Sequence, residues 1–349
     1  MDAELRILYI GEFATPQYDD AMADAFERLG NQVWRLRIHE RYLGGRGPLI
    51  RLQRRFLLGP AYVLLWLESL RLAQTVVPDV IYFRKPIEFP PSVLRLLKNR
   101  TGAILAEYMN DDPFGPDRRR HWLRYYHCSI PLFDVHFAFR KLNVSEFYTA
   151  GAIRVEVLWP YYVADMHYPS DLTAEDQQEY TCDAVFIGHG EPDIRVDCFD
   201  ALVEAGLDFR LGGSGFEPYA VGRPHARLLP TRYVSGDAYA RSVQAANCAL
   251  CFPSRRNRDV LTFRAFEVPA CGGVLVAERN SVMERLFRDG GEAFLFSSPQ
   301  ELVTIVRRLK AEPQLRKQVA AQGRKRVVSG GHEVIDRART VLSIIKGIV

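Results

Sequence analysis

The stretch CFPSRRNRDVLTFRAFEVPACGGVLVAE, from Cys251 to Glu278, decides the expected fold of this chain. It begins with a short apolar strand, continues through a basic loop into a helix, and reaches a second apolar strand after two glycines. A helix between two apolar strands predicts a right-handed crossover in a parallel sheet. Ligands of such sheets bind at the carboxyl ends of the strands, so the basic loop is a candidate site.

The same alternation of apolar strands and amphipathic helices extends in both directions from this stretch. Closing helices are expected at 299–309, 313–327 and 334–349. The expected strands are 5–11, 31–37, 80–85, 103–111, 134–139 and 154–159 in the first half, and 182–190, 208–215, 248–254, 273–278 and 292–298 in the second.

The chain is expected to fold as an α/β protein with two Rossmann-like halves. Its 349 residues exceed one ordinary core and fit two domains of common size. Prolines, acids and a lack of apolar periodicity predict a linker between the halves. The expected boundaries are an N-terminal domain over 1–160, a linker over 161–180, a C-terminal domain over 181–330 and a closing helix over 331–349.

Composition places the chain among globular proteins of a reducing compartment. A quarter of the residues are charged and 48% are hydrophobic. The six cysteines include one close pair, Cys248 and Cys251, which a strand would direct to opposite faces, so both are expected in the core. The start, MDAELRILYIGE, has acids where a signal peptide has a basic segment. We therefore expect a cytoplasmic protein.

An apolar run from Phe56 to Leu67 allows two interpretations. Its twelve residues include Gly-Pro and fall short of the roughly twenty that span a membrane. One interpretation is a buried helix. The other is peripheral contact with an anionic membrane through Arg35–Leu67, because Arg35–Arg55 holds seven arginines and one acid.

Several common motifs are absent from the sequence. It has no P-loop, no G-x-G-x-x-G after the first strand and no nucleophile elbow. It also lacks the D-x-D pattern that many sugar transferases use to bridge a diphosphate through a metal. We therefore expect no metal and no cofactor. Aromatic stacking modules are absent too, so nucleic acid is not an expected partner.

The basic loop and its helix suit a nucleotide. We expect Thr262 to cap the helix, whose free N–H groups would face a phosphate together with Ser254, Arg255 and Arg264. Glu267 follows one turn later, and a carboxylate can accept hydrogen bonds from two adjacent ribose hydroxyls. The alternative is a structural glutamate that a neighbouring arginine holds.

These residues carry a resemblance to a known family. The D-x7-E spacing from Asp259 to Glu267, followed by VPACGG, is similar to the E-x7-E donor motif of retaining GT-B glycosyltransferases in glycosyltransferase family 4. The segments ERLFRDGGEAFLFSSPQEL, YMNDDPF and DMHYPSD resemble the CgeB-like, spore-maturation branch. The resemblance implies a GT-B fold and a nucleotide-sugar donor in the second domain.

The resemblance also implies roles for single residues. Glu267 would bind the ribose, and Asp259 would face the transferred sugar in place of the usual glutamate. Gly188 and His189 match the family's glycine turn after the first strand of the donor domain, where N–H groups would approach the diphosphate. The predicted donor-binding residues are Glu267, Arg264, Thr262, Phe263, Arg255, Ser254, Gly188, His189 and Arg195.

The first domain is expected to hold the acceptor at its strand ends. Asn110 and Asp111 are the predicted acceptor-binding residues, and Asp112, Glu12 and Asp259 are the candidate catalytic carboxylates. The alternative for Asp111 and Asp112 is an Asp-Asp-Pro turn.

Three functions are therefore open. The first is a glycosyltransferase of cell-envelope or other glycan synthesis that moves a sugar to a glycan or lipid-linked acceptor. The resemblance implies retention, and in a retaining transfer the leaving diphosphate can deprotonate the acceptor hydroxyl while arginines neutralise the charge without a metal. The second is a nucleotide-sugar epimerase of the UDP-GlcNAc 2-epimerase type. The third is a binder of nucleotide sugars without catalysis, which the aspartate at 259 would favour.

Overall fold

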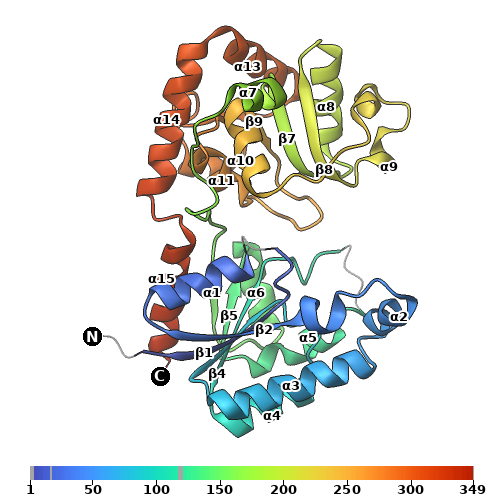
Figure 1. Ribbon diagram of the computed structural model, residues 1–349, viewed down its shortest axis with the longest axis vertical. Helices are drawn as coiled ribbons and strands as arrows, with labels where there is room; N and C mark the ends of the chain where they lie inside the picture. The colour runs from blue at the N-terminus through green and yellow to red at the C-terminus, as the bar shows by residue number, and fades with distance from the viewer. Residues whose placement is uncertain (1–3, 16–17, 117–120, 349) are drawn as a thin grey trace. The chain divides into compact units, whose positions relative to one another are not determined.

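The computed structural model describes residues 4–15, 18–116 and 121–348, which form two compact units. Unit 1 comprises Met1–Trp159 and Val334–Val349, and unit 2 comprises Pro160–Glu333. Each unit is built on a parallel sheet with helices on both faces, as Figure 1 shows. The expected α/β class with two Rossmann-like halves is confirmed.

Unit 1 contains a six-stranded parallel sheet in the order β2-β1-β3-β4-β5-β6. Strand β1 pairs with β2 on one side and with β3 on the other, so the strand order reverses between β1 and β3. The carboxyl ends at this reversal are the usual ligand site of such a sheet. The strands are β1 (Arg6–Gly11), β2 (Gln32–Arg37), β3 (Val80–Arg84), β4 (Ile104–Met109), β5 (Val135–Ala138) and β6 (Val155–Val157).

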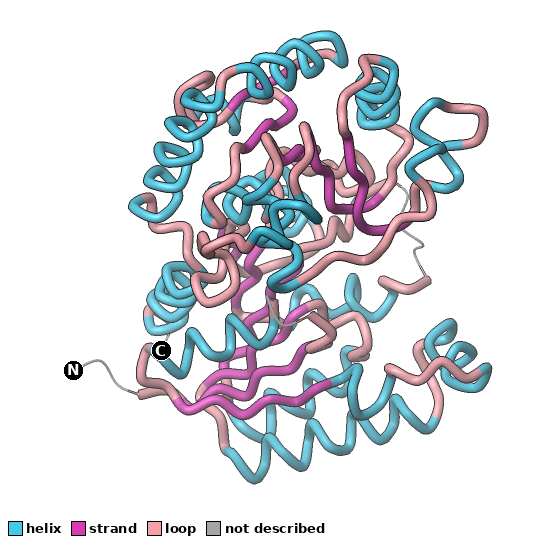
Figure 2. Tube along the Cα trace, turned by 45° about the horizontal axis from the view of Figure 1, so that its top comes forward, coloured by secondary structure: helices cyan, strands magenta, loops and turns pink. Residues whose placement is uncertain are grey.

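The strands of unit 1 are apolar on both faces because helices cover both. Ile81 and Phe83 pack in one core, and Tyr82 faces the other side, edge-on to Phe26 with ring centroids 5.4 Å apart. Helices α1 and α15 cover one face, and α3 and α4 cover the other (Figures 1 and 2). The helices are α1 (Asp19–Arg28), α2 (Pro48–Phe56), α3 (Pro60–Val76), α4 (Pro91–Thr101), α5 (Arg124–Ser129), α6 (Lys141–Thr149) and α15 (Val334–Lys346), with short turns of π-helix at His39–Leu43 and 3-10 helix at Ile130–Leu132.

Unit 2 contains a five-stranded parallel sheet in the order β11-β10-β9-β7-β8. Val185 and Ile187 pack on one face, and Phe186 packs on the other. Cys248 and Cys251 lie in these two opposite cores, as the sequence predicts. The strands are β7 (Ala184–His189), β8 (Phe209–Ser214), β9 (Ala249–Cys251), β10 (Leu275–Glu278) and β11 (Phe294–Phe296).

The helices of unit 2 include the expected pair near its end, α13 and α14. They are α7 (Ala174–Tyr180), α8 (Ile194–Glu204), α9 (Glu217–Ala220), α10 (Gly236–Ala245), α11 (Arg264–Ala270), α12 (Ser281–Leu286), α13 (Pro299–Ala311) and α14 (Pro313–Ser329), with a 3-10 turn at Pro224–Leu228. Gly272, with φ of +81°, follows α11 and turns the chain into β10.

The expected linker contains a helix of its own. Thr173 caps α7: its hydroxyl accepts from the Asp176 N–H at 3.1 Å, and the Asp176 carboxylate accepts from the Thr173 N–H at 3.0 Å. This reciprocal pair is a capping box, which needs no apolar periodicity. Helix α7 packs against α10 within unit 2. At the other end of the chain, α15 packs against α1 and completes unit 1.

The interpretation of Phe56–Leu67 as one buried helix is correct only in part: Tyr62 and Leu65 of α3 are buried, but the run is divided between two helices. Leu57 adopts the left-handed conformation with φ of +51°, which ends α2, and Pro60 begins α3. Phe56 and Leu67 are 52% and 58% exposed. Among the described residues no single helix is long and apolar enough to cross a membrane, although α2 and α3, bent by 66°, pass that test as a pair by length and composition.

Candidate functional site

The carboxyl edge of the unit 2 sheet gathers most of the predicted donor residues. Because β7 pairs with β8 on one side and β9 on the other, the strand order reverses between β7 and β9. Gly188 lies at the end of β7, the turn that follows begins at Gly190, and the loop after β9 includes Ser254. These two segments flank the reversal, where ligands of open α/β sheets bind.

Glycines let the ends of β7 and β8, and the turns that follow them, approach each other closely. A Cβ on Gly213, whose φ is +116°, would lie 1.9 Å from the carbonyl oxygen of Gly188. A Cβ on Gly190 would lie 2.2 Å from the carbonyl oxygen of Gly215. The exposed His189 places Nδ1 3.1 Å from the Ser214 hydroxyl. Backbone therefore lines this turn, as close approach of a phosphate requires.

Arg264 lies against the end of β7. Its Nε donates to the carbonyl oxygen of Ile187, and its Nη2 lies 3.3 Å from the position that a Cβ on Gly188 would take. The structure therefore brings together Gly188 and Arg264, two residues that the sequence proposed separately. An arginine is always charged and suits oxygen anions, so this position favours a diphosphate at the turn.

Glu267 lies in α11, one turn after Arg264, and is 7% exposed. The Tyr239 hydroxyl donates to its Oε2 at 3.1 Å, and His167 Nε2 lies 3.9 Å from its Oε1. His167 Nδ1 accepts from the Val163 N–H at 3.0 Å, so in the neutral ring Nε2 carries the proton. Burial lowers the pKa of His167. The carboxylate of Glu267 therefore accepts a hydrogen bond from a phenol and faces an imidazole. The alternative from the sequence, a structural glutamate, needed an arginine as its partner.

The loop after β9 takes its shape from Glu191, which follows β7. The Glu191 carboxylate is buried and accepts from the Ser254 hydroxyl at 2.7 Å and from the Arg256 N–H at 3.2 Å. The Ser254 carbonyl in turn accepts from the Asp259 N–H at 2.8 Å. Ser254 and Asp259 are thus placed by a carboxylate that the sequence reasoning did not single out.

Arg255 forms an ion pair with Glu278 at the end of β10. Burial raises the pKa of Glu278, while the charge of Arg255 lowers it. The Arg255 side chain is 57% exposed, so its charge is also open to solvent beside the loop. A half-exposed guanidinium can exchange a carboxylate for a ligand anion at moderate cost.

Arg195 ties the two flanking segments together. It is 3% exposed and donates to the carbonyl oxygens of His189 at 2.6 Å and Pro253 at 2.9 Å, and to the Asp193 carboxylate at 2.8 Å. These bonds make Arg195 a positioning residue of this edge. Its predicted contact with a diphosphate stays a prediction.

The expectation that Thr262 caps α11 is wrong. The residue before the helix is Phe263, already in helical conformation, and no side chain caps this end. The Thr262 hydroxyl instead lies 3.3 Å from the Cys251 sulfur in β9. Phe263 packs edge-on against Tyr161, with ring centroids 5.1 Å apart. The helix begins at Arg264, one residue later than a Thr262 cap requires, and the Thr262 hydroxyl points to β9 instead.

Asp112 is buried within unit 1. Its side chain is 0% exposed, and Oδ1 accepts from the Phe114 N–H and from the Asn143 amide, both at 3.0 Å. The bond to a backbone N–H two residues on matches the turn that the sequence left as the alternative. A catalytic role for Asp112 stays a prediction without a geometric argument in its favour.

The other predicted residues of unit 1 lie nearer solvent. Glu12 is partly exposed after β1. Asp111 is ion-paired with Lys85 at 3.2 Å, and Asn110 Oδ1 accepts weakly from Arg84 at 3.4 Å. Arg84 ends β3, Lys85 follows it, and Glu12 follows β1. These groups therefore lie at the carboxyl ends of the strands on either side of the strand reversal of unit 1.

Sequence reasoning missed four residues that shape the unit 2 edge. His167 lies in the quoted segment DMHYPSD, and Glu278 ends the quoted strand VLVAE, so both were visible. Tyr239 and Glu191 carried no local signal, because their partners lie far away in the sequence. The missed residues are His167, Tyr239, Glu191 and Glu278.

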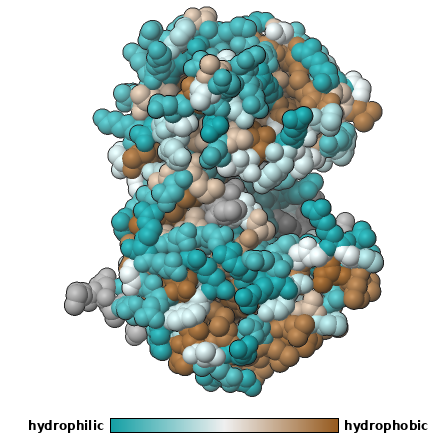
Figure 3. Space-filling view, in the orientation of Figure 1, coloured by the Kyte–Doolittle hydropathy of each residue, from teal (hydrophilic) through white to brown (hydrophobic). Residues whose placement is uncertain are grey.

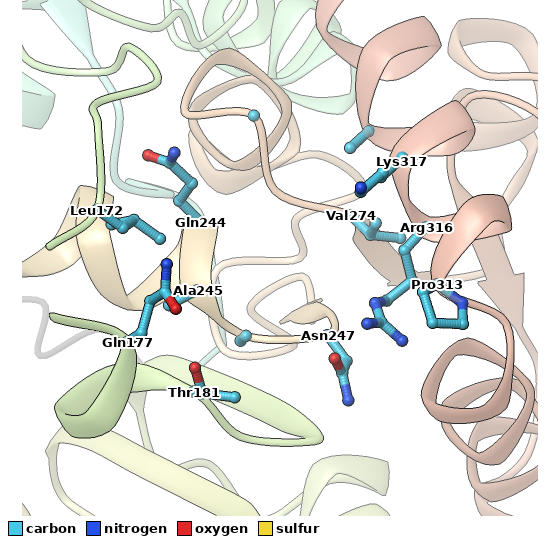
Figure 4. A pocket seen from close by; sticks show the side chains of 13 residues that line it. Leu172, Gln177, Thr181, Gln244, Ala245, Asn247, Val274, Pro313, Arg316 and Lys317 are labelled. Atoms are coloured by element: carbon cyan, nitrogen blue, oxygen red, sulfur yellow. The ribbon is translucent and has the colours of Figure 1, made fainter. Parts of the chain in front are cut away.

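A cavity of about 500 Å³ opens at the opposite edge of the unit 2 sheet (Figure 4). It lies near Thr181, Asn247 and Val274, which precede β7, β9 and β10. The predicted site residues, all of which the structure describes, do not line it. Elsewhere in the described ranges no group of three or more His, Cys, Asp or Glu could hold a metal ion.

Comparison with known proteins relates the second part of the chain to glycosyltransferases. Residues 195–343 match the model of a family described as glycosyl transferase-like. The expected enzyme class, glycosyltransferase, is confirmed at this level. A search of curated proteins found no match.

Solved structures resemble the chain over nearly its whole length. The Anabaena protein HepE, in complex with UDP-glucose, is 14% identical with a TM-score of 0.66, covering 99% of this chain and 100% of that one. Sucrose-phosphate synthase from Thermosynechococcus elongatus is 13% identical with a TM-score of 0.70, covering 99% of both chains. A glycosyltransferase from Rickettsia africae is 12% identical with a TM-score of 0.65, covering 99% and 98%. The fold is GT-B, and assignment to the CgeB-like branch stays a prediction.

Proposed function

We propose that this protein transfers a sugar from a nucleotide-diphosphate-sugar to an acceptor hydroxyl, with the donor at the carboxyl edge of the unit 2 sheet. The observation that carries the proposal is the position of Arg264 beside the Gly188 turn, with Glu267 one helical turn further. A diphosphate at the turn and a ribose at the carboxylate would occupy neighbouring positions on one short helix.

The proposed roles follow the chemistry of each group. Arg264 and the N–H groups after Gly188 would neutralise the diphosphate. Glu267 would accept the ribose hydroxyls, with Tyr239 holding one of its oxygens in place. Asp259 would face the sugar, as the resemblance to retaining GT-B enzymes implies.

We further propose that transfer proceeds with retention and without a metal. The leaving diphosphate would take the proton of the acceptor hydroxyl, and arginine charge would stabilise the developing negative charge. Arg264 and Arg255 supply such charge without a metal ion. The protein's task would then be to position its substrates.

The acceptor is proposed to bind unit 1, at the strand ends that carry Glu12, Asn110 and Asp111. A glycan or a lipid-linked sugar fits these carboxylate and amide groups, which bind hydroxyls. We place the protein in the cytoplasm, with contact at the inner face of the membrane. HepE, bound to UDP-glucose, supports a nucleotide sugar as the donor class for this fold.

Thermal stabilisation by a panel of nucleotide sugars tests the donor class. A ligand that binds the folded state raises the free energy of unfolding, by about 2.7 kcal/mol when the ligand concentration is a hundred times Kd. The melting temperature rises as a result. We expect one or a few nucleotide-diphosphate-sugars to stabilise the protein and the matching free sugars to have no effect. If no nucleotide or nucleotide sugar shifts the melting curve, the donor assignment fails.

A further inference from the structure

Seven large apolar side chains between residues 49 and 67 are exposed to solvent. In Figure 3, brown side chains gather over the part of unit 1 where Figure 1 places α2 and α3. A group of this kind marks an interaction surface, whereas single exposed leucines need no explanation. The seven side chains, 43–66% exposed, are Leu49, Leu52, Phe56, Leu58, Val63, Leu64 and Leu67.

Helix α2 contributes little to the core of unit 1. Of its nine residues, Gln53 alone is buried. Leu49, Leu52 and Phe56 are three and four residues apart and share one face of the helix, which points to solvent. Folding of unit 1 therefore does not explain why this helix is amphipathic.

The arginines of α2 face solvent, although the charge of Arg54 also acts on the buried Glu88 and lowers its pKa against the effect of burial. Arg51, Arg54 and Arg55 are exposed, and in the described ranges no ion pair joins them to a carboxylate. The nearby Arg35 and Arg37 differ, because they pair with acids of α1 at 2.6 Å. An exposed apolar face on one side of a helix and exposed arginines on its polar side suit an anionic and apolar partner.

We propose that α2, the turn after it and α3 form a docking face for a bilayer that contains anionic lipid. We call this the α2–α3 face, defined by the seven apolar residues above together with Arg51, Arg54 and Arg55. The apolar side chains would enter the boundary between headgroups and acyl chains, and the guanidinium groups would bind lipid phosphates. The bend of 66° between the helices suits contact along a surface.

Charge favours lipid over a second copy of this chain. In a symmetric dimer, the same face lies on both sides of the interface, so arginines would approach arginines. Such an interface would bury like charges without partners, at high cost. A bilayer supplies phosphates to the same arginines.

Binding to vesicles tests the proposal. We would measure co-sedimentation with vesicles of phosphatidylcholine alone and of phosphatidylcholine with about a third phosphatidylglycerol. The wild type should bind the anionic vesicles tightly and the neutral ones weakly, and added salt should weaken binding. Each arginine is worth about fivefold, so R51Q/R54Q/R55Q should lose about a hundredfold.

A matched control separates this face from total charge. R307Q/R324Q/K325Q removes the same charge from exposed positions of α13 and α14 in unit 2 and should bind vesicles as the wild type does. L49Q/L52Q/F56Q should also lose binding, with an unchanged melting temperature because α2 packs so little. Donor stabilisation should be unaffected in all three variants, so failure here removes the proposed membrane contact and leaves the proposed sugar transfer intact.

Several results would overturn the proposal. Equal binding to neutral and anionic vesicles would remove the role of the arginines, as would an arginine variant that binds like the control. Vesicle binding by the wild type that does not weaken with added salt would also remove the role of the arginines. A dimer in light scattering that L49Q/L52Q/F56Q abolishes would assign the face to a second copy.

Discussion

At the scale of single residues, distant partners orient the carboxylate of Glu267. The Tyr239 hydroxyl donates to one oxygen, and His167 faces the other from 3.9 Å. A carboxylate held in this way loses little side-chain freedom on binding a ligand. The same logic places Arg264, whose bond to Ile187 holds its guanidinium beside the Gly188 turn.

Replacing Glu267 with alanine should weaken donor binding while the fold survives. Loss of one charge-assisted hydrogen bond costs about 1.5–3 kcal/mol, so the donor Kd should rise at least roughly tenfold to a hundredfold. Calorimetry with the donor found by thermal screening measures this. Tyr239→Phe, which removes one supporting bond, should have a smaller effect. A normal melting curve with unchanged affinity would take Glu267 out of the site.

Replacing Gly188 with alanine should displace the Phe186 ring and crowd the Arg264 guanidinium. The new Cβ would lie 2.7 Å from the Phe186 ring and 3.3 Å from Arg264 Nη2, so a neighbour must move. Donor affinity should fall, and the free nucleoside diphosphate should lose as much affinity as the whole donor. Gly47→Ala is a suitable control, because no atom lies within 4 Å of its Cβ position. Equal donor affinity in both variants would contradict the diphosphate position.

The residue scale also shows how far sequence reasoning could reach. Gly188 and Arg264 were predictable because each belongs to a local pattern, a strand end and a helix start. Tyr239 was not predictable, because its contact with Glu267 joins helices α10 and α11, and nothing in the local sequence marks it. Thr262 was mispredicted because capping depends on where the helix begins, which local sequence places poorly.

At the scale of elements, strands were easier to predict than the helices of the first hundred residues. Every expected strand is present, because each is a short apolar run between turn residues. The prediction of a single buried helix over Phe56–Leu67 failed because apolar residues are buried on average. Here Leu57, in the left-handed conformation, ends one helix, and several side chains of the run are exposed to solvent. Helix α7 was missed because a capping box, and not periodicity, marks it.

The contact between α3 and the segment after β3 should depend on pH. Trp66 Nε1 donates to the Glu88 carbonyl at 3.0 Å, and the Glu88 side chain is 7% exposed. Burial, reinforced by the charge of Glu12, raises the pKa of Glu88 from 4.5 to about 8. The folded state therefore holds a proton that the unfolded chain releases, so stability falls as pH rises from about 4.5 to 8.

Glu88→Gln removes this dependence because an amide does not titrate. The difference in melting temperature between the variant and the wild type should shift in favour of the variant as pH rises from 5 to 8. Above pH 8 this difference should stay constant. Each pKa unit corresponds to about 1.4 kcal/mol, so the gain should amount to several degrees. Melting curves across this pH range measure it. Parallel profiles for the two proteins would show that the Glu88 carboxyl titrates normally.

At the scale of the whole molecule, two units with separate cores are joined by the chain at Trp159–Pro160 and at Glu333–Val334. Each unit has a strand reversal with polar groups at its carboxyl edge. This arrangement suits a reaction with two substrates, because each can bind a site that its own sheet positions. An epimerase or a binder would need the unit 2 site alone.

Product analysis with a labelled donor tests the central claim most directly. The donor, labelled in the sugar, is incubated with a panel of soluble and lipid-linked acceptors in excess EDTA, with the wild type and with Glu267→Ala. We predict label on an acceptor, release of one nucleoside diphosphate for each sugar transferred, and a large loss of rate in the variant. Label that appears as free or epimerised sugar without any acceptor would contradict glycosyl transfer, and activity that returns only with magnesium or manganese would contradict the metal-independent mechanism.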